Sequence, residues 1–386
     1  MAKSRIALNL KRLRLAAGLT QADLATAASL SRVAYRNIET GASDPRSETL
    51  QRLADALRVP IAELVEPYRH LEHVRFRSHS KPRCRDQILI EVARWLEDYR
   101  WLLNELGIDM GDPKANLPRR ISKNPKKAAM QVRESLLDEG SPDCPIADIA
   151  RLLESKGIKV KSMELGEGVF GLSVSSDDGG PAVIVNTAGS IPVERWIFSA
   201  AHELGHIVLH LSSFSVSKES EDSTEEDEAN EFAAQFLMPD DAFKKKWKET
   251  GGLHFVDQVL RVKTHFNVSY KTVLYRLIEF GGADNSIWRL FPALYKERYH
   301  RRLGFRDEPA GASEARFYGG VPPTRKSQEP DHLPDSQRHE DRLAQLVRMA
   351  LEDGKITASR ASEILGISAT ELQDRAKLWA RLKQAE

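Results

Sequence analysis

The stretch "FSAAHELGHIVLH", residues 198–210, places a glutamate between two histidines inside an otherwise apolar run. The spacing of its apolar residues predicts a buried helix over about 192–212. His202 and His206 stand one turn apart on one face of that helix, with Glu203 beside them. Imidazole and carboxylate groups are costly to bury without partners, so the pattern needs a chemical reason.

Metal binding supplies such a reason. Two imidazoles at this spacing can bind one zinc ion, and the glutamate between them can act on a zinc-bound water. A tetrahedral zinc ion in a hydrolase takes a third protein ligand and leaves the fourth place to water. His210 lies about 12 Å along the axis from His202, too far to share the ion, so we expect it to be structural or to line the cleft. The alternative without metal is a pair of hydrogen-bonded core histidines.

The third ligand should be a carboxylate from another helix, and "EEDEANEFAAQFLMP", residues 225–239, offers several. Its apolar residues predict a buried face, and Glu228 lies four residues before Phe232 on that face. We therefore choose Glu228. Glu225, one turn further out, is the second choice, and Glu231 points more to the side.

Composition limits the kind of protein. Of 386 residues, 41% are hydrophobic and 29% charged, which indicates a soluble globular protein of several domains. The net charge of +1 gives no information about partners. Cys84 and Cys144 are too far apart for metal-type spacing, and so few cysteines suit a reducing cytoplasm. With no signal peptide and no apolar run near the ~20 residues that span a bilayer, we expect a cytoplasmic protein without a membrane partner.

The fold class expected is mainly α with a small β-sheet (α+β). The pattern divides the chain into five segments. They are a helix-turn-helix domain (residues 1–66), a linker with an amphipathic helix (67–127), a zincin-like metallopeptidase domain (128–298), a second linker (299–338) and a helical module (339–386). The acidic residues 219–222 are expected in a solvated loop.

Two strands are predicted just before the histidine helix, at "VFGLSVS" and "PAVIVN", joined by the turn "SDDGGP". The segment "AVIVN", residues 182–186, could offer a sheet edge with which an extended substrate pairs. That hypothesis requires the strand to lie at the edge of its sheet.

The linker helix carries apolar residues in alternating three- and four-residue steps over about three heptads. They are Leu89, Val92, Leu96, Tyr99, Leu103 and Leu106. A coiled-coil contact in a homodimer and a helix docked on its own chain are equally compatible with this spacing.

The N-terminal module is predicted to bind double-stranded DNA. Residues 1–60 hold ten Lys or Arg against five Asp or Glu, a local charge of +5 that attracts phosphates. Two short helices meet at a tight turn, and the second presents polar side chains outward. The side chains expected toward the groove are Arg32, Val33, Arg36 and Asn37. Gln21, at the start of the helix before the turn, can bind a phosphate. A helical packing domain that never touches DNA is the alternative.

The motifs "AAHELGHIVLH", "EDEANEFAAQFLMP", "AVIVN" and "NVSYKTVLYRLIEFG" occur in an order that resembles the ImmA/IrrE family of metallo-endopeptidases, over about residues 143–282. This resemblance implies zinc held by His202, His206 and Glu228, with Glu203 as catalytic base. Manganese can also occupy such a site. The resemblance further implies cleavage of a transcriptional repressor in stress response or mobile-element control.

"TQADLA", "SRVAYRNIETG" and "LQRLADAL" resemble the Xre/Cro-type repressor domain over about residues 5–65, which implies dimers on two DNA half-sites. The C-terminal "ITASRASEILGISATEL" resembles a small helix-turn-helix, with a protein-contact helical pair as the alternative. Together the motifs favour a DNA-binding regulator with a zinc endopeptidase domain. The rival hypothesis is a non-catalytic transcriptional repressor or antitoxin-like regulator, whose metal domain is a sensor or scaffold.

Overall fold

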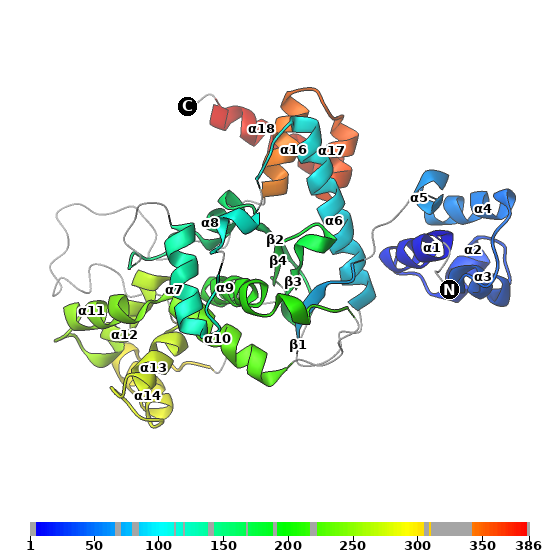
Figure 1. Cartoon of the computed structure of the whole chain (residues 1–386). Coiled ribbons are helices and arrows are strands. Elements are labelled where there is room, and N and C mark those ends of the chain that lie inside the picture. The colour runs from blue at the N-terminus through cyan, green and yellow to red at the C-terminus, as the bar shows by residue number, and fades with distance from the viewer. Residues whose placement is uncertain are drawn as a thin grey trace.

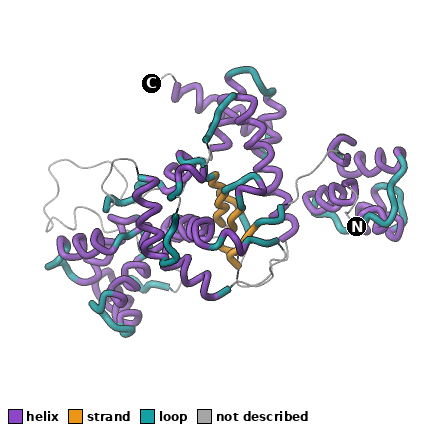
Figure 2. The backbone as a smooth tube through the Cα atoms, viewed as in Figure 1, coloured by secondary structure: helices purple, strands orange, loops and turns teal. Residues whose placement is uncertain are grey.

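A computed structural model describes residues 5–65, 71–78, 85–111, 113–118, 120–137, 143–166, 169–187, 191–216, 222–304, 309 and 342–383. Helices dominate these residues, and one small sheet lies at the centre of the larger body (Figure 2). The predicted fold class, mainly α with a small sheet, is confirmed. Most of the second predicted linker and the acidic residues 219–221 lie outside the described residues.

Short helices build the N-terminal domain, at the right of Figure 1, and two of them begin at side-chain caps. Thr20 and Asp23 form a reciprocal capping box, and Ser31 caps the next helix. Between them Ser29 has a φ of 55°, which makes the tight turn that the sequence predicts. The helices are α1 (Arg5–Ala16), α2 (Gln21–Ala27), α3 (Arg32–Thr40), α4 (Ser47–Leu57) and α5 (Ile61–Val65).

The sheet is mixed and four-stranded, in the order β1-β3-β4-β2. β2 and β4 run parallel, whereas β3 is antiparallel to both β1 and β4. The predicted hairpin between β3 and β4 is confirmed. The strands are β1 (Val74–Ser78), β2 (Lys159–Met163), β3 (Val169–Val174) and β4 (Ala182–Asn186).

The expected substrate edge at residues 182–186 is wrong. β4 lies between β3 and β2, and all five of its residues are buried. Both faces of the sheet are covered, which explains why this strand is an unbroken apolar run and not an alternating one. Among the described strands, the sheet edges are β1 and β2.

Each face of the sheet packs on its own group of helices (Figure 1). One face carries Val160, Val183 and Val185 and meets the histidine helix α9. The helices in this core are α7 (Pro125–Leu136), α8 (Ile149–Ser155), α9 (Val193–Leu209), α10 (Ser223–Leu237), α11 (Asp240–Glu249), α12 (Phe255–Phe266), α13 (Tyr270–Glu279) and α14 (Ile287–Tyr299). Short 3₁₀ turns, η1 (Pro113–Asn116), η2 (Ser176–Asp178) and η3 (Leu211–Ser213), connect the larger elements.

The other face packs against α6 (Arg85–Leu106). Four residues of the heptad pattern, Leu89, Val92, Leu96 and Tyr99, are buried in this core. Of the two alternatives for this helix, the structure shows docking on its own chain. The segment predicted as a linker thus contributes a helix and, through β1, a strand to the central body.

The C-terminal module is helical as predicted and packs on α6. It consists of α16 (Arg342–Glu352), α17 (Ala358–Leu365) and α18 (Ala369–Lys383). Arg360 of α17 pairs with Asp98 of α6 at 2.8 Å. In the described part of the chain, no helix is both long and apolar enough to cross a bilayer.

Candidate metal centre

Helix α9 carries the histidine–glutamate motif into the core. Trp196, Ala200 and Leu204 pack inward, and His202, Glu203 and His206 each have 0% exposure. Gly205 allows α10 to approach closely, because a Cβ at this position would lie 3.1 Å from Cδ1 of Phe232. The two helices therefore pack side by side over the length that bears the polar groups.

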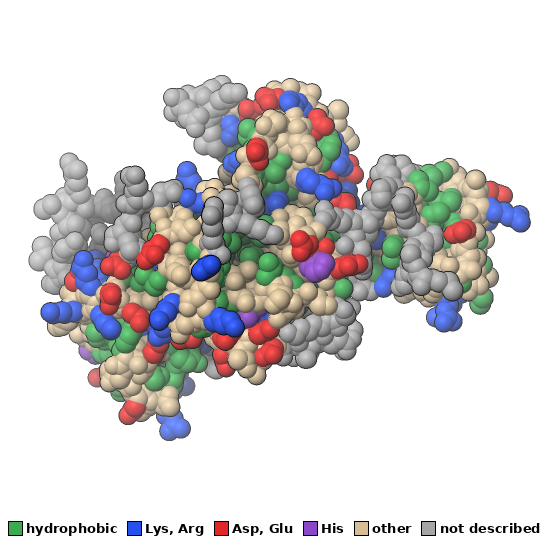
Figure 3. All heavy atoms as spheres, viewed as in Figure 1, with side chains coloured by type: hydrophobic (Ala, Val, Ile, Leu, Met, Phe, Trp, Pro, Cys, Tyr) green, Lys and Arg blue, Asp and Glu red, His purple; other side chains and the backbone are tan. Residues whose placement is uncertain are grey.

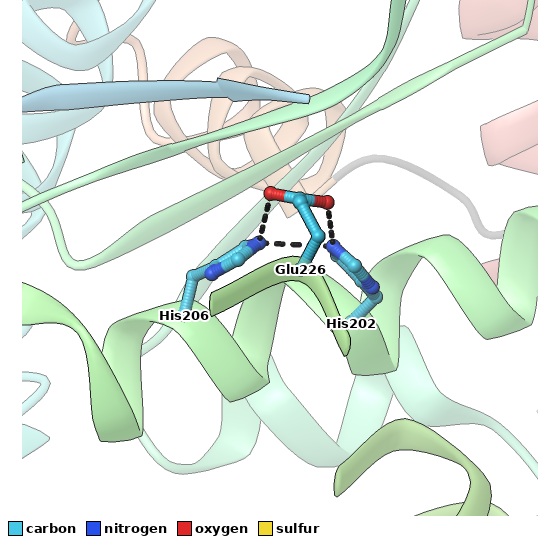
Figure 4. A group of neighbouring side chains, drawn as sticks. All are labelled: His202, His206 and Glu226. Carbon is cyan, nitrogen blue, oxygen red and sulfur yellow. Dashed lines mark hydrogen bonds and ion pairs between the residues drawn. The ribbon is translucent and has the colours of Figure 1, made fainter. Parts of the chain in front are cut away.

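Three side chains from these two helices converge (Figure 4). Nε2 of His202 lies 2.9 Å from Nε2 of His206 and 3.1 Å from Oε2 of Glu226. Nε2 of His206 lies 3.1 Å from Oε1 of Glu226. Ligand atoms around a tetrahedral zinc ion are separated by about 3.4 Å, so the three groups need to move only slightly to bind one.

The carboxylate beside the histidines belongs to Glu226, and not to the expected Glu228 or to Glu225. Residues two apart on a helix are turned by about 200°, so Glu226 and Glu228 cannot share a face. Glu226 shares its stripe with Asn230, whose side chain also contacts His202. Glu228 shares the stripe of Phe232 and lies outside the converging group, so the candidate third ligand becomes Glu226 in place of Glu228.

Each of the other acidic candidates has a different place. Oε2 of Glu228 lies 2.8 Å from Nε2 of His210. Glu225 accepts a hydrogen bond of 2.6 Å from Ser213. Glu231 is exposed, in agreement with its expected sideways position. His210 stands at the C-cap of α9, where its ring contacts His206, so it is placed next to the site without belonging to the three converging groups.

The hydrogen bonds on the outer ring nitrogens favour metal binding. Nδ1 of His202 lies 2.9 Å from Oδ1 of Asn230, an acceptor that favours a proton on this nitrogen and leaves Nε2 to bind a cation placed between it and Glu226. Burial lowers the pKa of His206 to about 4, which keeps its ring neutral near pH ~7. One nitrogen of each imidazole and a carboxylate oxygen lie within 4.8 Å of one another. A divalent cation is the natural partner for this donor set, and it fits zinc or manganese.

Glu203, which follows His202 on α9, lies against the sheet. Ser173 on β3 donates a hydrogen bond to its carboxylate. A Cβ at Gly171 would lie only 2.7 Å from Oε1 of Glu203. The absence of a side chain at Gly171 therefore gives the carboxylate its place against β3.

Arg75 of β1 is a site residue that the sequence reasoning missed. Its side chain, 4% exposed, donates to Glu225 and, over 3.0 Å, to Oε1 of Glu226. Burial opposes the charged form, but the two carboxylates outweigh it and hold the pKa of Arg75 above its usual range. The alternation of "VRFRS" was the available signal for a strand. Its partner β3 lies almost a hundred residues away, so local sequence does not reveal the contact.

In the N-terminal domain, the side chains expected at DNA lie on the surface of α3. Arg32, Val33, Arg36 and Asn37 are exposed, and Gln21 at the start of α2 is half-buried. Lys and Arg side chains project from this domain at the right of the space-filling view (Figure 3). The core behind them holds Leu24, Tyr35 and Leu53, each with 0% exposure.

Two family models match parts of the chain. Residues 153–278 match the Peptidase_M78 model, described as an IrrE N-terminal-like domain. Residues 10–64 match the HTH_3 model, described as helix-turn-helix. No curated protein matches the chain.

The architecture is therefore that of a metallopeptidase-like domain joined to a DNA-binding domain. More specifically, the chain carries an IrrE N-terminal-like domain with an Xre-type helix-turn-helix domain at its N-terminal side. The resemblance drawn from the motifs is confirmed, with narrower bounds. β1 and Arg75 lie outside both matched ranges.

Proposed function

We propose that the protein is a DNA-binding transcriptional regulator whose second domain is a metal-dependent endopeptidase. His202, His206 and Glu226 would hold zinc, or manganese, and Glu203 would be the catalytic base. The observation that carries the proposal is the convergence of two imidazole nitrogens and a carboxylate next to a buried glutamate. HExxH motifs with a third carboxylate ligand have this composition in zinc peptidases.

The residues divide the chemistry among them. When bound, a zinc ion would lower the pKa of a water at the site toward ~7 and polarise the scissile carbonyl. Glu203 would accept a proton from the attacking water and pass it to the leaving amine. Ser173 orients the Glu203 carboxylate through its hydroxyl, and Asn230 keeps the lone pair of His202 directed inward.

The DNA-binding domain would hold the peptidase domain at an operator. Exposed Arg32, Arg36 and Asn37 suit base contacts in the major groove, and Gln21 suits a phosphate. The protein substrate in this proposal is a helix-turn-helix repressor, whose cleavage would switch on stress or mobile-element genes. The proposal places the protein in the cytoplasm, where its operator lies. Homodimers on two half-sites would need a surface other than the buried heptad face of α6.

Replacing Glu203 by glutamine tests the proposal. The variant keeps the size of the side chain but removes the base, so cleavage of purified repressors encoded near the gene should fall by about 10²–10⁴-fold. Zinc content and operator binding should remain as in the wild type. Glu231→Gln, an exposed change on α10, is the control and should cleave normally. Equal cleavage by the Glu203 and Glu231 variants would refute the assigned role.

One observation favours the rival function, a non-catalytic repressor or antitoxin-like regulator. His202, Glu203 and His206 have no solvent exposure, and β1 already pairs with the β3 edge that lies against Glu203. A metal at this site would then serve as a sensor or a structural element. If the Glu203→Gln variant regulates target genes like the wild type, this second function is the correct one.

A further inference from the structure

The third histidine of the opening motif contacts a metal-site histidine. Nδ1 of His210 lies 3.0 Å from Nδ1 of His206, on the side of the ring that faces away from Glu226. Nε2 of His210 lies 2.8 Å from Oε2 of Glu228. His210 is 6% exposed, and the Glu228 side chain is 39% exposed. A continuous chain therefore runs from a half-exposed carboxylate through two rings to the metal group.

The carboxylate sets the direction of the hydrogen bonds. An ionised carboxylate only accepts, so the Nε2–H of His210 donates to Glu228. In its neutral form the His210 ring has no second proton, and its Nδ1 accepts. The proton between the rings then belongs to Nδ1 of His206. Nε2 of His206, which lies 3.1 Å from Oε1 of Glu226, is then left to give its lone pair to a metal ion bound between the two groups.

We propose that His210 and Glu228 are positioning residues, which hold His206 in the tautomer and ring orientation that bind the metal. This inference rests on the proposed metal centre and extends it beyond the residues that touch the ion. Partners of this kind fix the ring of a ligand histidine and raise its basicity.

The two histidine ligands are supported in different ways. Asn230 holds His202 through a neutral amide oxygen, whereas a charged group supports His206 through His210. Charge-assisted hydrogen bonds are roughly twice as strong as neutral ones. The Glu228 contact is therefore expected to strengthen metal binding although the residue itself lies outside the coordinating group.

The test uses the full chain and zinc ion alone. Zinc affinity is measured by competition with a chelator for His210→Leu, His210→Gln, Glu228→Gln and the control Glu231→Gln. His210→Leu removes the acceptor and should weaken zinc binding by about 10–100-fold. His210→Gln retains an amide oxygen that can accept from His206 and should restore most of the loss. Glu228→Gln should weaken binding by about tenfold, and Glu231→Gln should leave it unchanged.

Two further measurements separate positioning from general stability. The thermal midpoint of the metal-free protein shows whether a variant is merely less stable. Nitrogen NMR of labelled histidine in the zinc-loaded wild type should show a protonated Nδ1 on His206. Wild-type affinity in both His210→Leu and Glu228→Gln, or a proton absent from that nitrogen, would overturn the inference. If the wild type itself binds no zinc, the proposed metal centre fails, and the two failures are thereby distinguished.

Discussion

Arg75 and the metal ion should compete as partners of Glu226. The Arg75 side chain is 4% exposed and contacts Glu225 and Glu226, whose side chains are 18% and 14% exposed. Replacing it by glutamine removes the guanidinium charge from two partly buried carboxylates. Breaking a buried pair in this way costs about 3–5 kcal/mol.

Zinc should return part of that loss, because it supplies positive charge to one of the two carboxylates. If half of the loss is recovered, about 1.5–2.5 kcal/mol is added to zinc binding. At 1.4 kcal/mol for each factor of ten, Arg75→Gln should bind zinc about 10–60-fold more tightly than the wild type. The metal-free variant should at the same time unfold at a lower temperature.

Chelator competition and thermal unfolding, each with and without zinc, measure these quantities. Arg94→Gln is the matched control, because its guanidinium forms an exposed pair with Glu363 at 2.9 Å. Exposed pairs contribute about 0–1 kcal/mol, so the control should behave like the wild type. Unchanged or weaker zinc binding by Arg75→Gln would refute the reasoning, since Arg75 would then position Glu226 and not compensate it.

Three further changes give separable results. Gly171→Ala places a Cβ 2.7 Å from Oε1 of Glu203 and 3.0 Å from a backbone oxygen of Ile184, so the Glu203 carboxylate must move. The rate of cleavage should fall by about 10²-fold while zinc affinity is retained, and full activity would contradict the site geometry. Burial lowers the pKa of Lys159 from 10.5 to about 8, so the folded state gains stability as the pH rises from about 8 to 10.5. Lys159→Met should therefore raise the free energy of unfolding near pH ~7 by at most about 3 kcal/mol. An equal gain near pH ~11, where the lysine is neutral in both states, would refute this cause. Arg36→Ala should weaken operator binding by about 1–3 kcal/mol in a gel-shift titration, whereas an equal loss on every DNA sequence would indicate a phosphate contact.

The local parts of the site could be predicted from sequence. His202 and His206 share a helix face through a fixed four-residue spacing, and no other part of the chain is needed to place them. The third ligand depends on how α10 is rotated against α9, which is a tertiary property. Phe232 did not indicate that rotation correctly, because it packs against Gly205 of α9 and not beside the histidine side chains. Asn230, four residues after Glu226, contacts His202 and so lies on the face of α10 that is turned toward the histidines.

The arrangement of the sheet was harder to predict for a similar reason. "AVIVN" is apolar at nearly every position, which is typical of a central strand covered on both faces, and the edge interpretation did not use that signal. The heptad spacing of α6 predicted an apolar face correctly but not its partner. Packing against the sheet and α16 buries the same face that a coiled coil would bury.

A crystal structure of the zinc-loaded full chain would test the metal centre most directly. The ion is expected to be bound by Nε2 of His202, Nε2 of His206 and one oxygen of Glu226, with a water in the fourth place. Coordination by Glu228, or a fourth protein group in place of the water, would contradict the account.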